Sequence, residues 1–185
     1  MDQNDQADIQ ASLNGDEQAF ARLVRRYEQQ VADLMWRFTR DRQQLAELVQ
    51  DAFVEVYFSL PRYRGDAPLL RWIRRIATRV GYRFWKARSR QRNVVSIQDY
   101  DQPITAGDVE TADPSEAAEL LERLLGRLKP AERMVLTLEY LEGLSIDDIA
   151  ERMGWTRAMV KMRAYRARNK LKKIASQEEG LKWNL

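Results

Sequence analysis

Apolar residues recur three and four positions apart along most of the N-terminal half of the chain, with polar residues between them. This spacing is typical of amphipathic helices that bury one face. It predicts one helix over residues 16–40, a second over 45–60 and a third over 69–84. Pro61 ends the second helix, because its ring and its missing N–H interrupt a helix, and Pro68 precedes the third. We expect these three helices to pack into one small domain.

The periodic pattern stops after Arg92. Residues 93–113 contain a proline and a glycine, and every charged residue among them is acidic, so we interpret this segment as a flexible acidic linker. A helical pattern resumes near Pro114, and another follows Pro130. The alternation that is typical of strands does not persist anywhere. The expected fold class is therefore all-α, with two small helical domains joined by a flexible linker.

The C-terminal region carries the signature of a helix-turn-helix within residues 144–173. Ser145 and Asp148 fit a capping box, in which the hydroxyl accepts a backbone N–H and the carboxylate reaches back to the cap. Gly154 is suited to a left-handed turn, and Thr156 is suited to cap the next helix. The pattern predicts a short helix, a tight turn and a second, longer helix.

The second helix of this motif has two unlike faces. Its apolar face comprises Val160, Ala164, Ala167 and Leu171. Its outward face comprises Arg157, Lys161, Met162, Tyr165, Arg166 and Arg168. Many charged faces only keep a bundle soluble, but such faces usually mix both signs, and no acid occurs between residues 157 and 173. Because a one-signed face repels itself unless a polyanion offsets it, we interpret this face as a surface for the DNA major groove.

A second basic segment covers residues 62–92, where Asp66 is the single acid. Aromatic residues are interleaved with its arginines, which suits a surface that binds backbone phosphates and stacks unpaired bases. The stacking candidates are Tyr63 and Trp85, whereas the expected core residues on the apolar stripe are Trp72 and Phe84. The segment therefore predicts contact with single-stranded nucleic acid.

The composition narrows the function classes further. The 185 residues include no cysteine and no histidine, which excludes disulfides, the common zinc sites and His-dependent catalytic triads. The carboxylates are scattered among arginines rather than paired in an apolar setting, so we expect no enzyme activity, no metal and no cofactor. The polar, acidic start and the absence of an apolar run of about 18 residues predict a cytoplasmic protein without membrane insertion.

Several short motifs occur in an order that is more specific than any one of them. They are GDEQAF at 15–20, LVRRY at 23–27, LVQDAFV at 48–54, YRGD at 63–66, WIRRIA at 72–77, LKP at 128–130, EGLS at 142–145, DIA at 148–150 and VKMRAYRAR at 160–168. In this order they resemble the extracytoplasmic-function (ECF) sigma factors of bacterial RNA polymerase, which retain only sigma domains 2 and 4. The resemblance spans nearly the whole chain. It implies a domain 2 of three to four helices in residues 1–93, an acidic linker in 94–113 and a domain 4 in 114–185.

The resemblance also implies partners and site residues. The residues implied to bind the promoter −10 element are Tyr63, Arg64, Arg79, Arg83, Trp85 and Lys86. Those implied to read the −35 element are Arg157, Lys161, Met162, Arg163, Tyr165, Arg166 and Arg168. Those implied to dock on the clamp coiled coil of the largest subunit of core RNA polymerase are Glu47, Gln50, Asp51 and Glu55. Further implied partners are the flap of the second-largest subunit and an anti-sigma factor, which is either soluble or membrane-linked and in the second case would associate the protein with a membrane.

The resemblance does not extend to the promoter sequence. Family members often carry Asn where this chain has Arg79, and Thr or Ser where it has Met159 and Met162. Two other functions fit parts of the pattern. A dimeric repressor would use only the helix-turn-helix and bind palindromic DNA without polymerase. A polymerase-binding or partner-sequestering protein would have no promoter role, and its activity would not depend on Lys161 or Arg166.

Overall fold

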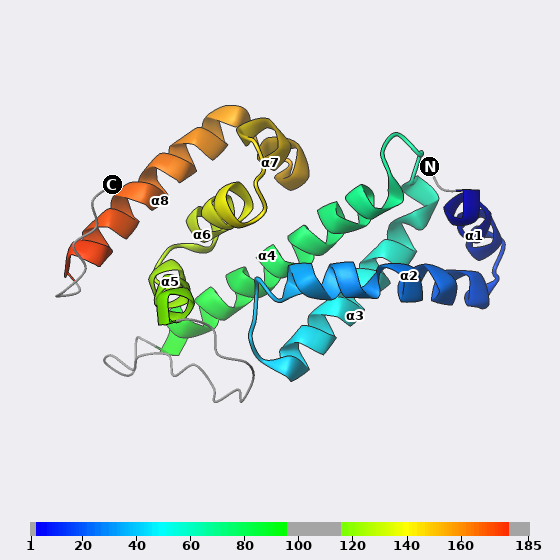
Figure 1. Cartoon of the computed structure of the whole chain (residues 1–185), viewed down its shortest axis with the longest axis horizontal. Helices are drawn as coiled ribbons and strands as arrows, with labels where there is room; N and C mark the ends of the chain where they lie inside the picture. Colours follow the sequence, from blue (N-terminus) through cyan, green and yellow to red (C-terminus); the bar gives the residue numbers. More distant parts are fainter. Residues whose placement is uncertain (1–2, 96–115, 178–185) are drawn as a thin grey trace. The chain divides into compact units, whose positions relative to one another are not determined.

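The computed structural model describes residues 3–95 and 116–177 of the chain, and every regular element in these two ranges is helical (Figure 1). The predicted all-α fold with two helical regions is confirmed. The chain divides into two compact units, residues 1–85 and 86–185, which are described separately below. Nearly all of the predicted linker 94–113, together with Pro114, lies outside the described residues. The boundaries 1–93 and 114–185 stay a prediction.

Four α-helices and one short 3₁₀ helix form the first unit, and its last helix continues into the second. They are α1 (Gln3–Leu13), α2 (Glu17–Met35), α3 (Arg42–Ser59), the 3₁₀ helix η1 (Leu60–Arg62) and α4 (Leu69–Val95). The three predicted helices correspond to α2, α3 and α4. Pro61 lies inside η1, so the regular part of α3 ends just before it, as the missing N–H of proline requires.

The start of α2 shows how the local sequence determines a helix boundary. Gly15 has a φ of +93°, a left-handed conformation that glycine adopts without strain. The side chain of Asp16 then accepts hydrogen bonds from the backbone N–H groups of Gln18 and Ala19, at 2.9 and 3.2 Å. These bonds satisfy donors that the first turn of a helix leaves without partners.

Close packing between α4 and the connection from α2 to α3 organises the core of the first unit. Gly81, in the middle of α4, is buried, and a Cβ added there would lie 2.5 Å from the ring of Phe38. Phe38 is itself buried, and its ring centroid lies 4.6 Å from that of Trp85. The same face of α4 buries Leu69, Ile73, Ala77 and Val80. These contacts determine which side of α4 remains available to solvent.

Helix α1 was missed by the apolar pattern, which predicted three helices, although the family resemblance implied three to four for this domain. Its buried face is largely polar: Asp5, Asp8 and Ser12 are buried there, with Ile9 as the apolar residue between them. Because two aspartates lie on its inward face, α1 lacks the continuous apolar stripe from which amphipathic helices are predicted. Helix α1 packs against α2 through these polar groups.

The second unit contains a short bundle in which α8 is the central helix. Its elements are α5 (Glu116–Gly126), α6 (Pro130–Leu136), the π-helical turn η2 (Thr137–Leu141), α7 (Ile146–Met153) and α8 (Arg157–Gln177). Helix α8 contacts α5, α6 and α7. The core cluster comprises Leu124, Leu125, Leu128, Leu136, Ala167 and Ile174.

The close contact at Gly81 predicts an unusual response to substitution. Gly to Ala within a helix normally stabilises a protein by roughly 0.5–1 kcal/mol. At Gly81 the new methyl group would collide with the buried Phe38 ring, so we expect Gly81→Ala to destabilise the first unit by about 1–3 kcal/mol. Gly126→Ala is the matched control, because a Cβ on this α5 residue meets nothing within 4 Å. Urea denaturation of both variants measures the difference, and stabilisation by Gly81→Ala would contradict the packing described.

Candidate nucleic-acid interface

The predicted helix-turn-helix is present, and its caps are made by the expected residues. The Ser145 hydroxyl accepts a hydrogen bond from the backbone N–H of Asp148 at 3.1 Å, and the Asp148 carboxylate accepts one from the Ser145 N–H at 3.3 Å. Gly154 ends α7 with φ 68° and ψ 35°, in the left-handed region. The Thr156 hydroxyl accepts the N–H of Met159 at 3.2 Å and so caps α8. These contacts confirm the capping predictions and set the direction in which α8 leaves the turn.

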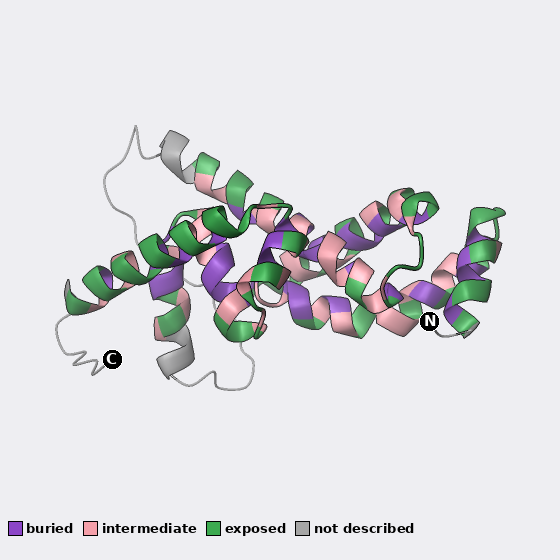
Figure 2. Cartoon of the chain, turned by 90° about the horizontal axis from the view of Figure 1, so that it is seen from above, coloured by how far each residue is buried: buried purple, intermediate pink, exposed green. Residues whose placement is uncertain are grey.

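Small and branched side chains seat α8 against the rest of its unit. Val160, Ala164 and Ala167 are fully buried, as predicted, and Leu171 is half-buried against the core cluster. The opposite side of the helix is exposed (Figure 2). There Lys161 and Arg166 are exposed, and Met162 and Tyr165 have 52% and 64% of their surface exposed. These two cations, the Met162 side chain and the Tyr165 ring form a surface that is available for a ligand along the outer face of α8.

Two of the predicted DNA-binding arginines form ion pairs with acids from neighbouring elements. Arg157 Nε lies 2.6 Å from a carboxylate oxygen of Asp147 on α7, and Arg168 Nη1 lies 3.2 Å from one of Glu139 in η2. The acids lie outside residues 157–173, so inspection of the helix sequence alone did not reveal them. Solvent-exposed pairs of this kind contribute no more than about 1 kcal/mol, so a phosphate could replace either acid.

Arg163 lies beside the outward face rather than on it, and its predicted contact with DNA stays a prediction. Its side chain is half-buried, and the guanidinium carbon lies 3.9 Å from the centroid of the Trp155 ring. A guanidinium above an indole ring is held by the ring quadrupole and by dispersion. Arg163 therefore packs α8 against the turn that precedes it.

Trp85 is also placed differently from the prediction. It has only 4% of its surface exposed, its ring packs on Phe38, and its Nε1 donates a hydrogen bond of 2.9 Å to the backbone carbonyl of Phe38. Its polar edge and its faces are thus engaged within the protein, so Trp85 is a core residue and not a base-stacking residue. The expected core residues Trp72 and Phe84 are half-buried.

Tyr63 lies in the loop between η1 and α4, and its side chain stabilises that loop. The hydroxyl donates a hydrogen bond of 2.6 Å to the backbone carbonyl of Ala67, and the ring centroid lies 5.1 Å from that of Trp72. Burial raises the pKa of Tyr63, and the negative charges of Asp5 and Asp66 raise it further. The phenol therefore stays neutral, and its half-buried ring closes the base of the loop.

The remaining residues predicted for −10 binding come from the loop and from α4. Arg64 and Lys86 are exposed, whereas Arg79 is half-buried. Burial lowers the pKa of Arg79, and the nearby positive charge of Arg75 lowers it further. This side of α4 thus places positive charges close enough to repel one another, a situation that a bound phosphate would relieve.

Arg83 of α4 forms an ion pair with Glu55, one of the residues that the resemblance implied to dock on polymerase. Its Nη2 lies 2.8 Å from a carboxylate oxygen of Glu55 on α3. Glu47, Gln50 and Asp51, the other residues predicted to dock on polymerase, are exposed along α3. The ion pair links the predicted polymerase face to the predicted DNA face within the first unit.

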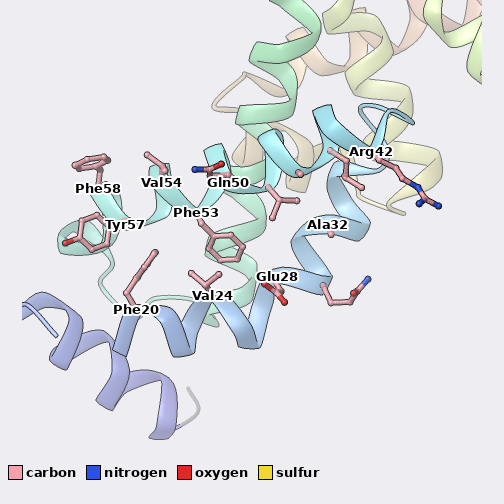
Figure 3. A pocket seen from close by; sticks show the side chains of 14 residues that line it. Phe20, Val24, Glu28, Ala32, Arg42, Gln50, Phe53, Val54, Tyr57 and Phe58 are labelled. Carbon is pink, nitrogen blue, oxygen red and sulfur yellow. The ribbon is translucent and has the colours of Figure 1, made fainter. Parts of the chain in front are cut away.

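An apolar groove between α2 and α3 was not predicted. It has a volume of about 790 Å³ and contains Phe20 and Val24 from α2 and Phe53, Val54, Tyr57 and Phe58 from α3. Phe20 and Tyr57 stand edge to face at one end, with ring centroids 4.9 Å apart, and Arg42 lies at the other end (Figure 3). Phe58 has 73% of its surface exposed. Phe20, Val24 and Tyr57 belong to the apolar stripes from which the helices over 16–40 and 45–60 are predicted, but no third element covers them in the part of the chain that the structure describes.

The described ranges, 3–95 and 116–177, contain neither a membrane-spanning helix nor a metal-binding cluster. No helix there is long and apolar enough to cross a membrane. No group of three or more acidic residues there is arranged to hold a metal ion.

Comparison with known proteins assigns both units. Residues 23–91 match the family Sigma-70 region 2, and residues 118–171 match Sigma-70, region 4. The ECF RNA polymerase sigma-E factor of Haemophilus influenzae is 32% identical over 173 residues, which cover 89% of this chain and 91% of that protein. The chain belongs to the ECF sigma factor family.

Other relatives agree with this assignment. RNA polymerase sigma-H factor of Pseudomonas aeruginosa is 30% identical to this sigma factor, with 92% of this chain and 93% of that protein covered. The solved structure of CnrH in complex with the cytosolic domain of CnrY has the same fold, with a TM-score of 0.58 at 23% identity over 95% of this chain and 99% of that one. Sigma factors of this family are not enzymes. The region 2 match extends from within α2 to within α4, and the region 4 match extends from within α5 to within α8.

The burial of Trp85 leads to a prediction about stability rather than DNA binding. We expect Trp85→Ala to destabilise the first unit by about 3–5 kcal/mol because it leaves a cavity beside Phe38. Trp85→Phe should cost less, roughly 0.5–1.5 kcal/mol for the lost hydrogen bond to the Phe38 carbonyl. The exposed Phe58 provides the control, because Phe58→Ala should change stability by less than about 0.5 kcal/mol. If Trp85→Phe left the urea midpoint unchanged but abolished binding to an opened −10 strand, the core assignment would be wrong.

Proposed function

We propose that this ECF sigma factor binds core RNA polymerase and directs it to promoters through two separate DNA contacts. In this proposal α8 reads the −35 duplex, and the loop and outer side of α4 capture the opened −10 strand. The observation that carries the proposal is the exposed face of α8 within a correctly capped helix-turn-helix. That face offers two cations and two apolar side chains, and α8 itself contains no acidic residue.

The chemistry of the α8 face suits the edges of base pairs. Lys161 and Arg166 would donate hydrogen bonds to guanine acceptors or to phosphates, and Met162 and Tyr165 would contact thymine methyl groups. Arg157 and Arg168 would exchange their carboxylate partners for phosphates, at little cost because both pairs are exposed. Phosphate contacts would position the helix, and the side chains at 161, 162, 165 and 166 would provide the selectivity.

The α4 surface suits a single strand better than a duplex. Arg64, Arg79 and Lys86 would bind backbone phosphates of the strand, and a phosphate near Arg79 would offset the repulsion from Arg75. Tyr63 would offer the exposed part of its ring to an unpaired base at the loop. The correction at Trp85 leaves Tyr63 as the stacking residue in this proposal.

The proposed polymerase contact lies on α3. Glu47, Gln50 and Asp51 form one exposed polar face, and Gln50 also lines the apolar groove. A helix of the clamp coiled coil could bury apolar residues against the groove while its basic residues pair with Glu47 and Asp51. The flap of the second-largest subunit is the partner that we propose for the second unit.

We also propose control by an anti-sigma factor. The fold is shared with CnrH, whose structure contains the cytosolic domain of CnrY, and with RpoE of Bartonella quintana, whose structure contains the anti-sigma factor NepR. The RpoE structure has a TM-score of 0.55 at 18% identity and covers 86% of this chain and 98% of that one. An exposed apolar groove beside the proposed polymerase face is a surface that an inhibitor could cover.

Transcription reconstituted with core polymerase tests the −35 assignment. The wild-type protein should give promoter-dependent transcripts, and Lys161→Ala or Arg166→Ala should weaken binding of the holoenzyme to the −35 duplex by roughly 1–3 kcal/mol if the contact is to a base. A contact to phosphate would instead weaken binding equally on all sequences. Lys172→Ala, at an exposed position nearer the end of α8, should have a much smaller effect.

Two results would contradict the proposal. Unchanged transcription and binding after removal of Lys161 and Arg166 would favour a polymerase-binding protein with no promoter role. Tight binding to palindromic DNA in the absence of polymerase would favour a dimeric repressor.

The docking assignment makes a separate prediction. The double variant Gln50→Ala, Asp51→Ala should lower affinity for core polymerase and leave binding of α8 to a −35 duplex unchanged, because these residues lie on α3. Glu151→Gln, an exposed acid on α7, provides the control for loss of a negative charge. Affinity for core polymerase can be measured by competition with a labelled sigma factor. Equal affinities for the double variant and the control would refute the assignment.

A further inference from the structure

Helix α1 is attached to α2 by a buried network of charged and polar groups, which we call the α1 clasp. It comprises Asp5 and Asp8 of α1 and Arg22, Arg26 and Tyr27 of α2. Asp5 has 3% and Asp8 has 6% of its surface exposed. Burial of a carboxylate is costly unless the group is paired and hydrogen-bonded, so these contacts are needed for α1 to remain in place.

Each aspartate of the clasp accepts two hydrogen bonds. Asp5 accepts one from Arg26 Nη1 and one from the Tyr27 hydroxyl, both at 2.5 Å. Asp8 accepts one from Arg22 Nε and one from Arg26 Nη2, both at 2.8 Å. Burial by itself would raise the pKa of Asp8, but the hydrogen bonds and charges of Arg22 and Arg26 outweigh it, and the pKa lies below its ordinary value. Arg26 therefore bridges the carboxylates of Asp5 and Asp8, which lie on successive turns of α1.

A network of this kind fixes position more effectively than it adds stability. Buried ion pairs gain little over apolar residues of similar size, because their attraction is largely offset by lost hydration. Charge-assisted hydrogen bonds are short and directional, so four of them together allow α1 few alternative placements. Helix α1 would otherwise be weakly held, since Ile9 is its single buried apolar residue in the described part of the helix.

The clasp lies beside the loop that is proposed to open the promoter. Helix α1 contacts η1, the turn that leads from α3 into this loop (Figure 1). The charge of Asp5 also acts on the phenol of Tyr63, whose hydroxyl closes the loop on the carbonyl of Ala67. The clasp and the base of the loop thus share one neighbourhood within the first unit.

From this placement we propose that the α1 clasp is a positioning element for the −10 loop. By holding α1 against η1, Asp5 and Asp8 fix the base of loop 62–67. Tyr63 and Arg64 are then already ordered when an unpaired base binds. The inference rests on the proposed capture of the −10 strand by this loop. It adds a role for five residues that contact neither DNA nor polymerase in that proposal.

The test compares two steps that take place on the same unit. Core-binding affinity depends on α3 and the groove, whereas promoter opening, measured by permanganate reactivity of −10 thymines, depends on the loop. We expect Asp5→Asn in the full-length protein to slow opening by about tenfold, comparable to the loss of one hydrogen bond to a charged group, with unchanged affinity for core polymerase. Arg22→Gln removes the most exposed hydrogen bond of the clasp, together with a weak ion pair to Asp16, and provides the milder variant if Asp5→Asn unfolds the unit.

Asp16→Ala distinguishes positioning from general destabilisation. Asp16 caps α2 and is linked to the clasp by an exposed ion pair of 3.7 Å with Arg22, which contributes little, so this variant should lower the melting temperature without slowing opening at temperatures where the protein is folded. Equal opening rates for the wild type, Asp5→Asn and Arg22→Gln would overturn the positioning role. An equal loss of core affinity and of opening would overturn it as well, in favour of a purely structural role. If wild-type holoenzyme itself failed to open any promoter, the proposed function would fail first.

Discussion

The contact between Gly81 and the ring of Phe38 determines how the first unit presents its basic helix. Because no side chain separates the two, α4 lies directly on the connection between α2 and α3, and Trp85 is drawn into the same buried cluster. This packing fixes the orientation of α4 about its own axis. It leaves Lys86 exposed and turns Arg83 toward Glu55, whereas Arg79 lies close to Arg75 because the two residues are one helical turn apart. The electrostatic surface of α4 is therefore a consequence of an apolar contact.

Both basic surfaces are partly neutralised within the protein. Glu55 pairs with Arg83 in the first unit, and Asp147 and Glu139 pair with Arg157 and Arg168 in the second. All three pairs are exposed and therefore weak, so they lower the self-repulsion of each surface and would be exchanged for phosphates in the proposed DNA contacts. In the proposed contact with the −35 duplex, selectivity then comes from the α8 side chains that are not in these ion pairs, above all the exposed Met162 and Tyr165.

The α1 clasp and the apolar groove, both in the first unit, have opposite chemistry. The clasp between α1 and α2 is polar, closed and satisfied internally, so it fixes the position of a helix. The groove between α2 and α3 is apolar and open, with Val54, Tyr57 and Phe58 left in water. Exposed apolar area of this kind is unfavourable for an isolated protein and favourable once a partner covers it. The groove is therefore suited to a partner, and the clasp to internal positioning.

The sequence by itself determined the helices other than α1 and the helix-turn-helix, because apolar periodicity, capping residues and turn glycines act over a few neighbouring residues. The order of its short motifs determined the family. Ser145, Gly154 and Thr156 behave as their local chemistry dictates. Only the tertiary structure decided what depends on distant neighbours: the burial of Trp85 under Phe38, the stacking of Arg163 on Trp155 and the docking of α1. In each case a side chain of polar or aromatic character found its partner on another segment, and periodicity along one helix carries no information about such a partner.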